Sequence, residues 1–371
     1  MYKLLIFIMI IIIFLNSCSD NNPVNTPEGL DLEQKIGQML IIGFRGIDIQ
    51  SNDPIVKDLE ARNIGGVVLF DKDVALNSTK RNIESPEQVK HLISTLTSYS
   101  NTKLLVCVDQ EGGKVARLKQ QYGFPYNVSQ QYLGDLDNID TSKFYANRTA
   151  NLLKNLGFNV NFAPVVDLNI NPDNPVIGKI ERSFSKSPDI VVKHSQILIS
   201  ELQQQGVLST LKHFPGHGSS NSDSHLGLTD ISNTWQSIEL EPYRRLINSN
   251  FNGMVMTAHI FNSYLDPEYP ATLSHKIITG ILREQLHYNG VVVSDDMNMG
   301  AITQQYGLER AIELSINAGV DILIFANNLV YDENIARKAI DIILDLVRQG
   351  KISKERIEES YQRIMKLKST L

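Results

Sequence analysis

The stretch VVVSDD at residues 291–296 shows the pattern that decides the fold. Three valines and a serine form a short run rich in β-branched residues, and two acidic residues follow directly. Such a run is typical of a strand that is buried on both faces of a parallel sheet. Because side chains alternate along an extended strand, Asp295 and Asp296 should point in different directions. Only one of them is expected to be a reactive carboxylate.

Runs of the same kind recur along the chain and alternate with helical stretches. We expect strands at residues 38–44, 66–70, 104–109, 160–167, 207–213, 254–260, 291–295 and 321–326. Helices are expected at residues 86–98, 142–156, 188–205, 235–248, 274–286, 308–318, 333–349 and 353–368. This alternation across residues 31–371 predicts an α/β fold, a single (β/α)₈ TIM-type barrel, whose usual size is about 250 residues or more with insertions. A doubly wound parallel sheet is the competing interpretation.

Polar side chains stand at the carboxyl ends of the expected strands. They are Asp109, Asp167, Lys212 with His213, His259 and Asp295. Enzymes with this barrel keep their chemistry at that end, so these positions predict one active site at the barrel mouth. In VCVDQEGGKVAR (residues 106–117), the Gly112–Gly113 pair would let the backbone approach a ligand closely. The motif IERSF places Arg182 in the long loop after the fourth expected strand.

The stretch LKHFPGHGSSNSDSHLGL at residues 211–228 contains three of the eight histidines. Loops rich in Gly, Pro and Ser rarely belong to a packed core, so His213, His217 and His225 are interpreted as binding or protonating groups. Together with Asp223 they are also side chains that ligate metals. The Pro and Gly inside HFPGH, however, prevent its two histidines from lying a helical turn apart as in HExxH. We therefore predict no metal and no other cofactor.

The charges around the expected mouth suit a sugar. Sugar hydroxyls both donate and accept hydrogen bonds, and those to carboxylates and cations are the stronger ones. The net charge of −6 and the pI near 5.8 exclude a nucleic-acid partner, which would require a basic surface. The nucleotide-binding motif GxxxxGK[ST] does not occur in the sequence.

The first residues, MYKLLIFIMIIIIFLNSC, have the features of a bacterial lipoprotein signal. The apolar run from Leu4 to Leu15 suits a secretory signal and is short for a transmembrane helix. We expect residues 1–17 to be the signal peptide, Cys18 to be lipidated, residues 18–30 to form a tether and residues 31–371 to form the catalytic domain. The protein would then lie outside the cytoplasm on a bacterial membrane. An uncleaved anchor is the alternative.

Five motifs together resemble the family 3 glycoside hydrolases. KHFPGHG (residues 212–218) is followed by DSH (223–225), with DQEGG (109–113) and ERSF (181–184) upstream and SDDMNM (294–299) downstream. The set is similar to the β-N-acetylglucosaminidase branch, typified by bacterial enzymes that recycle peptidoglycan. The similarity runs from KIGQMLIIGF at Lys35 to AGVDILIFANN ending at Asn328. It implies a (β/α)₈ barrel, alone or with a second domain, that cleaves β-linked N-acetylglucosamine with retention.

The resemblance also implies roles for single residues. Asp295 would be the nucleophile, and Asp223 with His225 would form a dyad whose imidazole is the general acid and base. The sugar would be bound by Asp109, Arg117, Arg182, Lys212 and His213. Many relatives have Asp at the position of Ser219, which affects only loop contacts. Histidine here replaces one carboxyl group of the usual glycosidase pair, and imidazolium is an adequate acid near neutral pH.

We therefore expect a monomeric, lipid-anchored exo-β-N-acetylglucosaminidase acting on peptidoglycan fragments or chitin-type oligosaccharides. A β-glucosidase or an N-acetylglucosaminide phosphorylase on the same barrel is the alternative among enzymes. An inactive, lipid-anchored sugar-binding protein is the alternative outside enzymes.

Overall fold

Eight parallel strands close into a barrel. The computed structural model describes residues 31–223 and 227–371. The strands are β1 (Leu40–Gly43), β2 (Gly66–Val68), β3 (Leu105–Val108), β6 (Val160–Asn161), β7 (Leu208–Phe214), β9 (Met254–Thr257), β11 (Val292–Asp296) and β12 (Ile322–Phe325). They follow one another around the barrel in chain order, and β12 pairs with β1 to close it. The predicted (β/α)₈ barrel is confirmed, and the doubly wound alternative is wrong.

The barrel strands are apolar because both of their faces are covered. β3 reads LVCV and β12 reads ILIF, and every residue of both strands is buried. In the closing pair, Leu40 lies opposite Leu323, and on the other side of β1, Ile41 lies opposite Gly66. Burial in β3 also raises the pKa of the Cys107 thiol well above its usual value.

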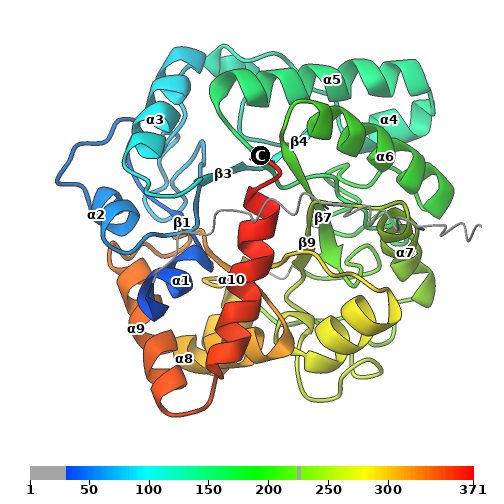
Figure 1. Cartoon of the computed structure of the whole chain (residues 1–371). Coiled ribbons are helices and arrows are strands. Elements are labelled where there is room, and N and C mark those ends of the chain that lie inside the picture. The colour runs from blue at the N-terminus through cyan, green and yellow to red at the C-terminus, as the bar shows by residue number, and fades with distance from the viewer. Residues whose placement is uncertain (1–30, 224–226) are drawn as a thin grey trace, which may run out of the picture.

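The helices between the strands lie on the outside of the barrel (Figure 1). They are α2 (Pro54–Glu60), α3 (Pro86–Ser98), α4 (Gln130–Leu136), α5 (Ile139–Leu156), α6 (Pro188–Gln204), α7 (Glu241–Asn248), α8 (Gly300–Ala318), α9 (Ile335–Arg348) and the π-helical segment η4 (Lys276–Gln285). Local sequence sets their ends. In α3, Pro86 occupies the first turn and the Ser85 side chain accepts a hydrogen bond from the Gln88 amide.

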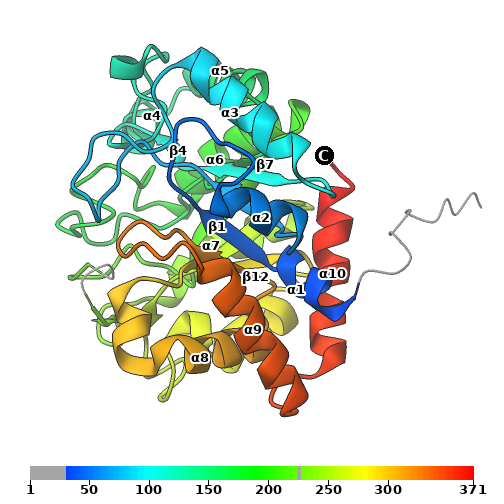
Figure 2. The same ribbon diagram turned by 90° about the vertical axis from the view of Figure 1, so that its left-hand side faces the viewer.

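Two further helices close the end of the barrel where the strands begin. α1 (Leu32–Gln38) and α10 (Lys354–Lys368) pack against each other there, whereas the loops that follow the strands gather at the opposite end (Figure 2). Lys368 is buried in this closure, and its Nζ donates to Gln38 Oε1 at 2.7 Å and to the Gly65 carbonyl at 2.8 Å. Burial lowers the pKa of Lys368 to about 7.

The expected elements differ from the structure mainly at their ends. Gln38, expected to begin a strand, is the last residue of α1. The fourth expected strand is regular only over Val160–Asn161, although Val165 still bridges to Lys212 further along. Helix α8 begins earlier than expected and has a kink at Gly307. The helices α1, α2 and α4 were not predicted, because seven residues each are too few for a periodic signal.

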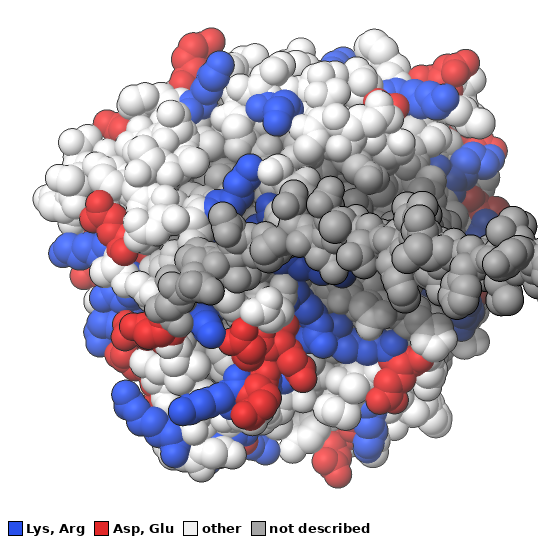
Figure 3. Space-filling model, in the orientation of Figure 1, with Lys and Arg blue, Asp and Glu red and all other residues white. Residues whose placement is uncertain are grey.

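Two small sheets lie at the mouth of the barrel. One is the hairpin formed by β4 (Gln110–Gly112) and β5 (Val115–Ala116), and in the other β8 (Thr229–Asp230) pairs with β10 (Ile260–Phe261). On the face that carries α10, basic and acidic side chains are interspersed (Figure 3).

Within residues 31–223 and 227–371, no helix has the length and apolar character needed to cross a membrane.

Candidate active site

The hairpin after β3 brings two charged side chains together at the mouth. Asp109 follows β3 directly, and the hairpin returns the chain so that the Arg117 amide donates to the Asp109 carbonyl at 3.2 Å. The turn requires glycine at position 112. Gly112 has a φ of +103°, and a Cβ there would lie 2.1 Å from the carbonyl oxygen of Val128.

Charged side chains from several strand ends join into one connected set, which we term the mouth network. Its members are Asp71, Asp109, Glu111, Arg117, Lys119, Asp167, Arg182, Lys212 and His213. All five of the predicted sugar-binding residues belong to it. The structure therefore brings together side chains that lie far apart in the sequence.

One half of the mouth network runs from the loop after β2 to β7. Lys119 Nζ lies 2.5 Å from Asp71 Oδ2, and Asp71 Oδ1 lies 3.9 Å from Arg117 Nη1. Arg117 Nη2 donates to Asp109 Oδ2 at 3.1 Å. Lys212, on β7, donates to the other oxygen of Asp109 at 2.9 Å. Positive and negative groups thus alternate along this half.

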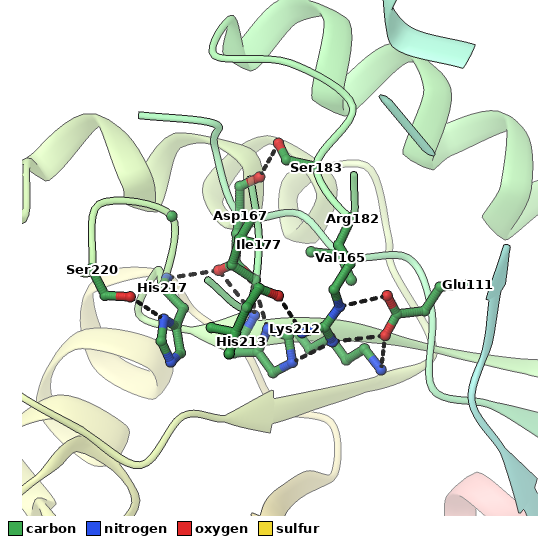
Figure 4. A network of polar contacts seen from close by, with 12 residues as sticks. Glu111, Val165, Asp167, Ile177, Arg182, Ser183, Lys212, His213, His217 and Ser220 are labelled. Carbon is green, nitrogen blue, oxygen red and sulfur yellow. Dashed lines mark hydrogen bonds and ion pairs between the residues drawn. The ribbon is translucent and has the colours of Figure 1, made fainter. Parts of the chain in front are cut away.

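The other half runs from Lys212 toward the loop after β6 (Figure 4). Lys212 Nζ also lies 2.6 Å from Glu111 Oε1. Arg182 holds the same carboxylate with two parallel hydrogen bonds of 2.8 Å, from Nε and Nη2. Arg182 Nη2 further lies 3.1 Å from His213 Nε2, and His213 Nδ1 lies 2.7 Å from Asp167 Oδ2. Such bidentate pairing fixes the plane of the guanidinium as well as its position.

Burial and charge act against each other in this network. Burial would raise the pKa of Asp109, but Lys212 and Arg117 outweigh it and hold that pKa well below the usual range. Burial likewise opposes ionisation of Glu111, whose pKa is nevertheless lowered by Arg182 and Lys212. These carboxylates are therefore charged at neutral pH. Removing one of the two partners would leave a buried charge only partly compensated, which is costly.

Three of the five predicted sugar-binding residues keep more than a tenth of the side chain exposed, as does Lys119 with 29%. The exposed fractions are 27% for Arg117, 17% for Asp109 and 11% for Arg182, against 2% for Lys212 and 1% for Glu111. The exposed edges can form charged hydrogen bonds to a ligand, while the buried members hold them in place. This division suits recognition of a polar, uncharged ligand that carries many hydroxyl groups.

Hydrogen bonds determine the protonation of the His213 ring. Burial would raise the pKa of Asp167, but His213 and His217 lower it, so Asp167 is ionised and can only accept. His213 Nδ1 must therefore carry the proton in the bond to Asp167. The guanidinium of Arg182 only donates, so His213 Nε2 must be the acceptor. With both nitrogens engaged, this ring is a poor metal ligand.

The loop after β7 is more buried than the sequence indicated. His213 is 6% exposed and His217 3% exposed, and burial lowers the pKa of His217 to about 4. Buried polar groups hold the loop backbone: Asn174 Nδ2 donates to the His217 carbonyl at 2.7 Å, and the Gly218 amide donates to Glu239 Oε2 at 3.1 Å. The interpretation of His213 and His217 as residues outside the core is therefore wrong. Partners distant in sequence draw this loop inward.

The predicted acid/base segment begins at Asp223, which is half-buried. Ser222 Oγ donates to Thr229 Oγ1 at 3.2 Å, so the two flanks of the segment lie side by side. His225 falls within residues 224–226, outside the residues that the structure describes, as does Cys18. The roles of these two residues stay predictions.

The two aspartates of VVVSDD lie in different surroundings at the end of β11. Asp296 Oδ1 accepts hydrogen bonds from the backbone amides of Asn298 at 3.0 Å and Ala326 at 2.9 Å. Asp295 Oδ1 accepts from the Asp296 amide at 2.7 Å, and the residue is half-buried. His259 Nε2 lies 3.0 Å from the Asp296 carbonyl and so steadies the strand end. The Asp296 carboxylate is thus tied by backbone amides both to the following turn and to the end of β12.

Sequence reasoning overlooked several members of this site. Glu111 lies inside DQEGG and Asp71 follows an apolar strand as Asp109 does, so both had a readable signal. Asp167 was noted at a strand end but received no role. Lys119 had no signal, because nothing in the sequence shows that the hairpin returns it to Asp71. In residues 31–223 and 227–371, no three His, Cys, Asp or Glu side chains are grouped so as to hold a metal ion.

Comparison with known proteins places the chain in a family. A model of the glycosyl hydrolase family 3 N-terminal domain matches residues 31–367. The chain belongs to this family. It is 34% identical to beta-hexosaminidase A of Pseudoalteromonas piscicida, over 92% of this chain and 62% of that relative. It is 32% identical to the beta-hexosaminidase of Nitrosomonas eutropha, over 78% of this chain and 80% of that enzyme.

A solved structure agrees with this family membership. The glycoside hydrolase family 3 beta-N-acetylglucosaminidase from Paenibacillus sp. str. FPU-7 superposes with a TM-score of 0.83 at 34% identity, covering 92% of this chain and 62% of that one. This chain thus spans less than two thirds of the Pseudoalteromonas and Paenibacillus proteins. The family and the glycoside hydrolase class predicted from the motifs are confirmed.

Proposed function

We propose that this protein is a retaining exo-β-N-acetylglucosaminidase that removes terminal β-linked N-acetylglucosamine from oligosaccharides. One observation carries the proposal. β11 carries Asp295 next to its last residue, at the same mouth where Asp109, Arg117 and Arg182 expose charged edges suited to sugar hydroxyls. The similarity to proteins named beta-hexosaminidase and beta-N-acetylglucosaminidase supports the choice of sugar.

In the first step, the Asp295 carboxylate attacks the anomeric carbon as the bond to the leaving oxygen breaks. Protonated His225 gives its proton to that oxygen, and the sugar is left as an ester of Asp295. In the second step, neutral His225 takes a proton from water, which displaces Asp295 from the anomeric carbon. Two inversions restore the original β configuration.

Asp223 has a supporting role in this scheme. A carboxylate near an imidazole favours the protonated form of the ring and can orient it. Asp223 lies two residues before His225, at the point where the described part of the loop ends. The dyad so formed replaces the second carboxyl group found in most glycosidases.

The mouth network would bind the sugar. Asp109, Arg117 and Arg182 would hydrogen-bond to its hydroxyls through their exposed edges, and Lys212 with His213 would complete the pocket beneath. No cofactor takes part in the proposed chemistry. We infer peptidoglycan fragments or chitin-type oligosaccharides as substrates, and a location outside the cytoplasm through lipid on Cys18.

One assay separates this proposal from its alternatives. The purified protein is given nitrophenyl β-N-acetylglucosaminide or nitrophenyl β-glucoside, with and without inorganic phosphate, and the first sugar product is observed by NMR. We expect release from the N-acetylglucosaminide, with the β anomer of free N-acetylglucosamine appearing first and no dependence on phosphate. Preference for the glucoside, formation of a sugar 1-phosphate, or sugar binding without release would each contradict the proposal.

A further inference from the structure

Asp167 is buried behind the mouth and contacts two parts of the site at once. Its exposed fraction is 0%. One carboxylate oxygen, Oδ2, lies 2.7 Å from Nδ1 of the His213 ring. The other, Oδ1, accepts from the His217 amide at 2.8 Å, and both oxygens accept from the His213 amide, at 3.1 and 3.2 Å. One side chain therefore holds a predicted sugar-binding ring and the start of the following loop.

The Asp167 backbone is itself fixed in place. Ser183 Oγ donates to the Asp167 carbonyl at 2.6 Å, and Ser183 directly follows the sugar-binding candidate Arg182 (Figure 4). The adjacent residue Val166 donates from its amide to the Lys212 carbonyl at 2.8 Å. The carboxylate thus projects from a segment that is tied both to β7 and to the loop after β6.

We propose that Asp167 is a positioning residue that aligns the sugar-binding ring of His213 with the start of the loop that leads to Asp223. The proposal rests on the proposed glycosidase function, because it assigns Asp167 the task of matching sugar binding to proton transfer.

The path from Asp167 to the loop is made of buried contacts. The His217 amide is held by Asp167, and the His217 carbonyl accepts from Asn174 Nδ2 at 2.7 Å. Asn174 Nδ2 also lies 3.0 Å from Ser220 Oγ, and Ser220 Oγ lies 2.9 Å from His217 Nδ1. Movement of the His217 amide would be passed through these contacts to Ser220, whose Oγ donates to the carbonyl of Ser222, the residue before Asp223, at 3.3 Å.

The chemistry explains why a carboxylate is needed at this position. Asp167 accepts through both oxygens at once, from the His213 ring on one side and from the His217 amide on the other. In an Asp167→Asn variant one oxygen would become an NH₂ group, which only donates. That group would face an N–H, so the variant must lose either the ring contact or the loop contact. The substitution hardly changes the size of the side chain, so its effect reports on the lost hydrogen bond.

The kinetic test compares Asp167→Asn with a matched control. Asp321→Asn alters another fully buried aspartate, which binds Arg283 and Arg356 at the end of the barrel remote from the mouth. We expect Asp167→Asn to lower kcat/KM for an N-acetylglucosamine disaccharide on the order of 10²-fold, with KM raised and kcat lowered. Asp321→Asn should leave both parameters near wild type at a temperature where it is folded. Equal effects of the two variants would overturn the proposal.

A double-mutant cycle tests the link to the loop. If Asp167 acts through the loop, Asp167→Asn and Asp223→Asn disturb the same step, and the combined loss in kcat should be clearly smaller than the product of the single losses. Losses that multiply would show that Asp167 does not act on the dyad, and would overturn that link.

A third measurement does not depend on any Asp167 variant being folded. The ¹⁵N resonances of the wild-type His213 ring, assigned with His213→Gln, should show a neutral ring protonated at Nδ1. Protonation at Nε2 instead would overturn the proposal. Wild-type protein that hydrolyses neither the N-acetylglucosamine disaccharide nor nitrophenyl β-N-acetylglucosaminide would contradict the proposed function. The NMR result would still report on the contact between Asp167 and the His213 ring.

Discussion

Asp295 and Asp296 carry the same functional group, yet their surroundings suit them to different tasks. Two backbone amides occupy the Asp296 carboxylate, one from the following turn and one from the end of β12. Asp295 Oδ1 accepts from the neighbouring Asp296 amide, and the residue lies half-buried at the mouth. Strand alternation separates a candidate nucleophile from a residue that shapes the strand end.

This difference predicts the outcome of two conservative substitutions. Asp295→Asn should lower kcat on the order of 10⁴-fold or more, because the amide cannot form the glycosyl ester. Asp296→Asn keeps an oxygen able to accept from Asn298 and Ala326, so it should remain folded and retain activity. Steady-state kinetics and thermal unfolding of both variants would check this. If the Asp296 variant were inactive and the Asp295 variant active, Asp296 would be the nucleophile instead of Asp295.

Residues of the site were predictable where a strand end or a motif marked them. Asp109, Lys212 and His213 follow apolar runs, and the structure joins them in the mouth network as expected of one barrel mouth. The partners that set their charge were not predictable. The contact of Glu111 with Lys212 and that of Asp167 with the His213 ring join segments that are far apart in the chain. No local sequence pattern predicts such contacts.

Among the elements, the loop after β7 leads to the predicted acid/base dyad. Its first residues are buried and tied to Asp167 and Glu239, and beyond Ser220 it becomes exposed at Asn221 and Ser222. The base of this loop is thus anchored, and the predicted general acid lies further along. An anchored base gives the residues that follow it a fixed starting point at the mouth.

The acid role of His225 predicts a dependence on the leaving group. A sugar leaving group needs a proton, whereas a nitrophenolate hardly does. His225→Ala should therefore lower the rate of oligosaccharide cleavage on the order of 10²- to 10⁴-fold. The loss in kcat/KM for nitrophenyl N-acetylglucosaminide should be much smaller. Equal losses on both substrates would leave His225 as a binding residue only.

At the other end of the barrel, α10 contributes a buried amine that predicts a pH effect on stability. Lys368 has an ordinary pKa of 10.5, which burial lowers to about 7 in the folded protein. Between these values the unfolded chain binds more protons than the folded chain, so the free energy of unfolding rises with pH. From pH 7 to pH 9, wild type should gain about 2 kcal/mol relative to Lys368→Met.

Urea unfolding of both proteins at the two pH values measures this gain. Lys368→Met also removes the donor to Gln38 and Gly65, so it should be less stable at either pH, and only the change with pH is diagnostic. An identical pH dependence in the two proteins would show that the amine is not neutral when buried.

Elements were predictable in proportion to their length and burial. All eight barrel strands were expected near their observed positions, because runs buried on both faces have a strong apolar signal. Helices of seven residues such as α1 and α4 were not expected, and the end of α1 replaced the expected start of a strand at Gln38. At such boundaries, tertiary packing outweighs local pattern.

For the whole molecule, the barrel separates the mouth from the end at which the chain enters. α1 begins at Leu32 at the end closed by α10, whereas Asp109, Lys212 and Asp295 lie at or near the carboxyl ends of their strands at the other. A tether from lipid on Cys18 would join the barrel at this entry end.

The anchor can be tested apart from catalysis. Cys18→Ser removes the acylated side chain, so the protein should move from the membrane fraction to the soluble fraction. Its activity per milligram should stay unchanged, because the barrel is untouched. Fractionation of cells and an assay of each fraction would measure both quantities. Variant protein that remains on membranes would indicate an uncleaved anchor.

The central claim is that Asp295 forms the covalent bond to the sugar, and trapping that bond tests it most directly. A fluorinated N-acetylglucosaminide with a good leaving group forms the glycosyl ester quickly and hydrolyses it slowly. Protease digestion and mass spectrometry then locate the label. We expect one sugar per chain, attached to Asp295 and absent from Asp295→Asn. A label on Asp296 or on any other residue, or turnover without a covalent adduct, would contradict the account.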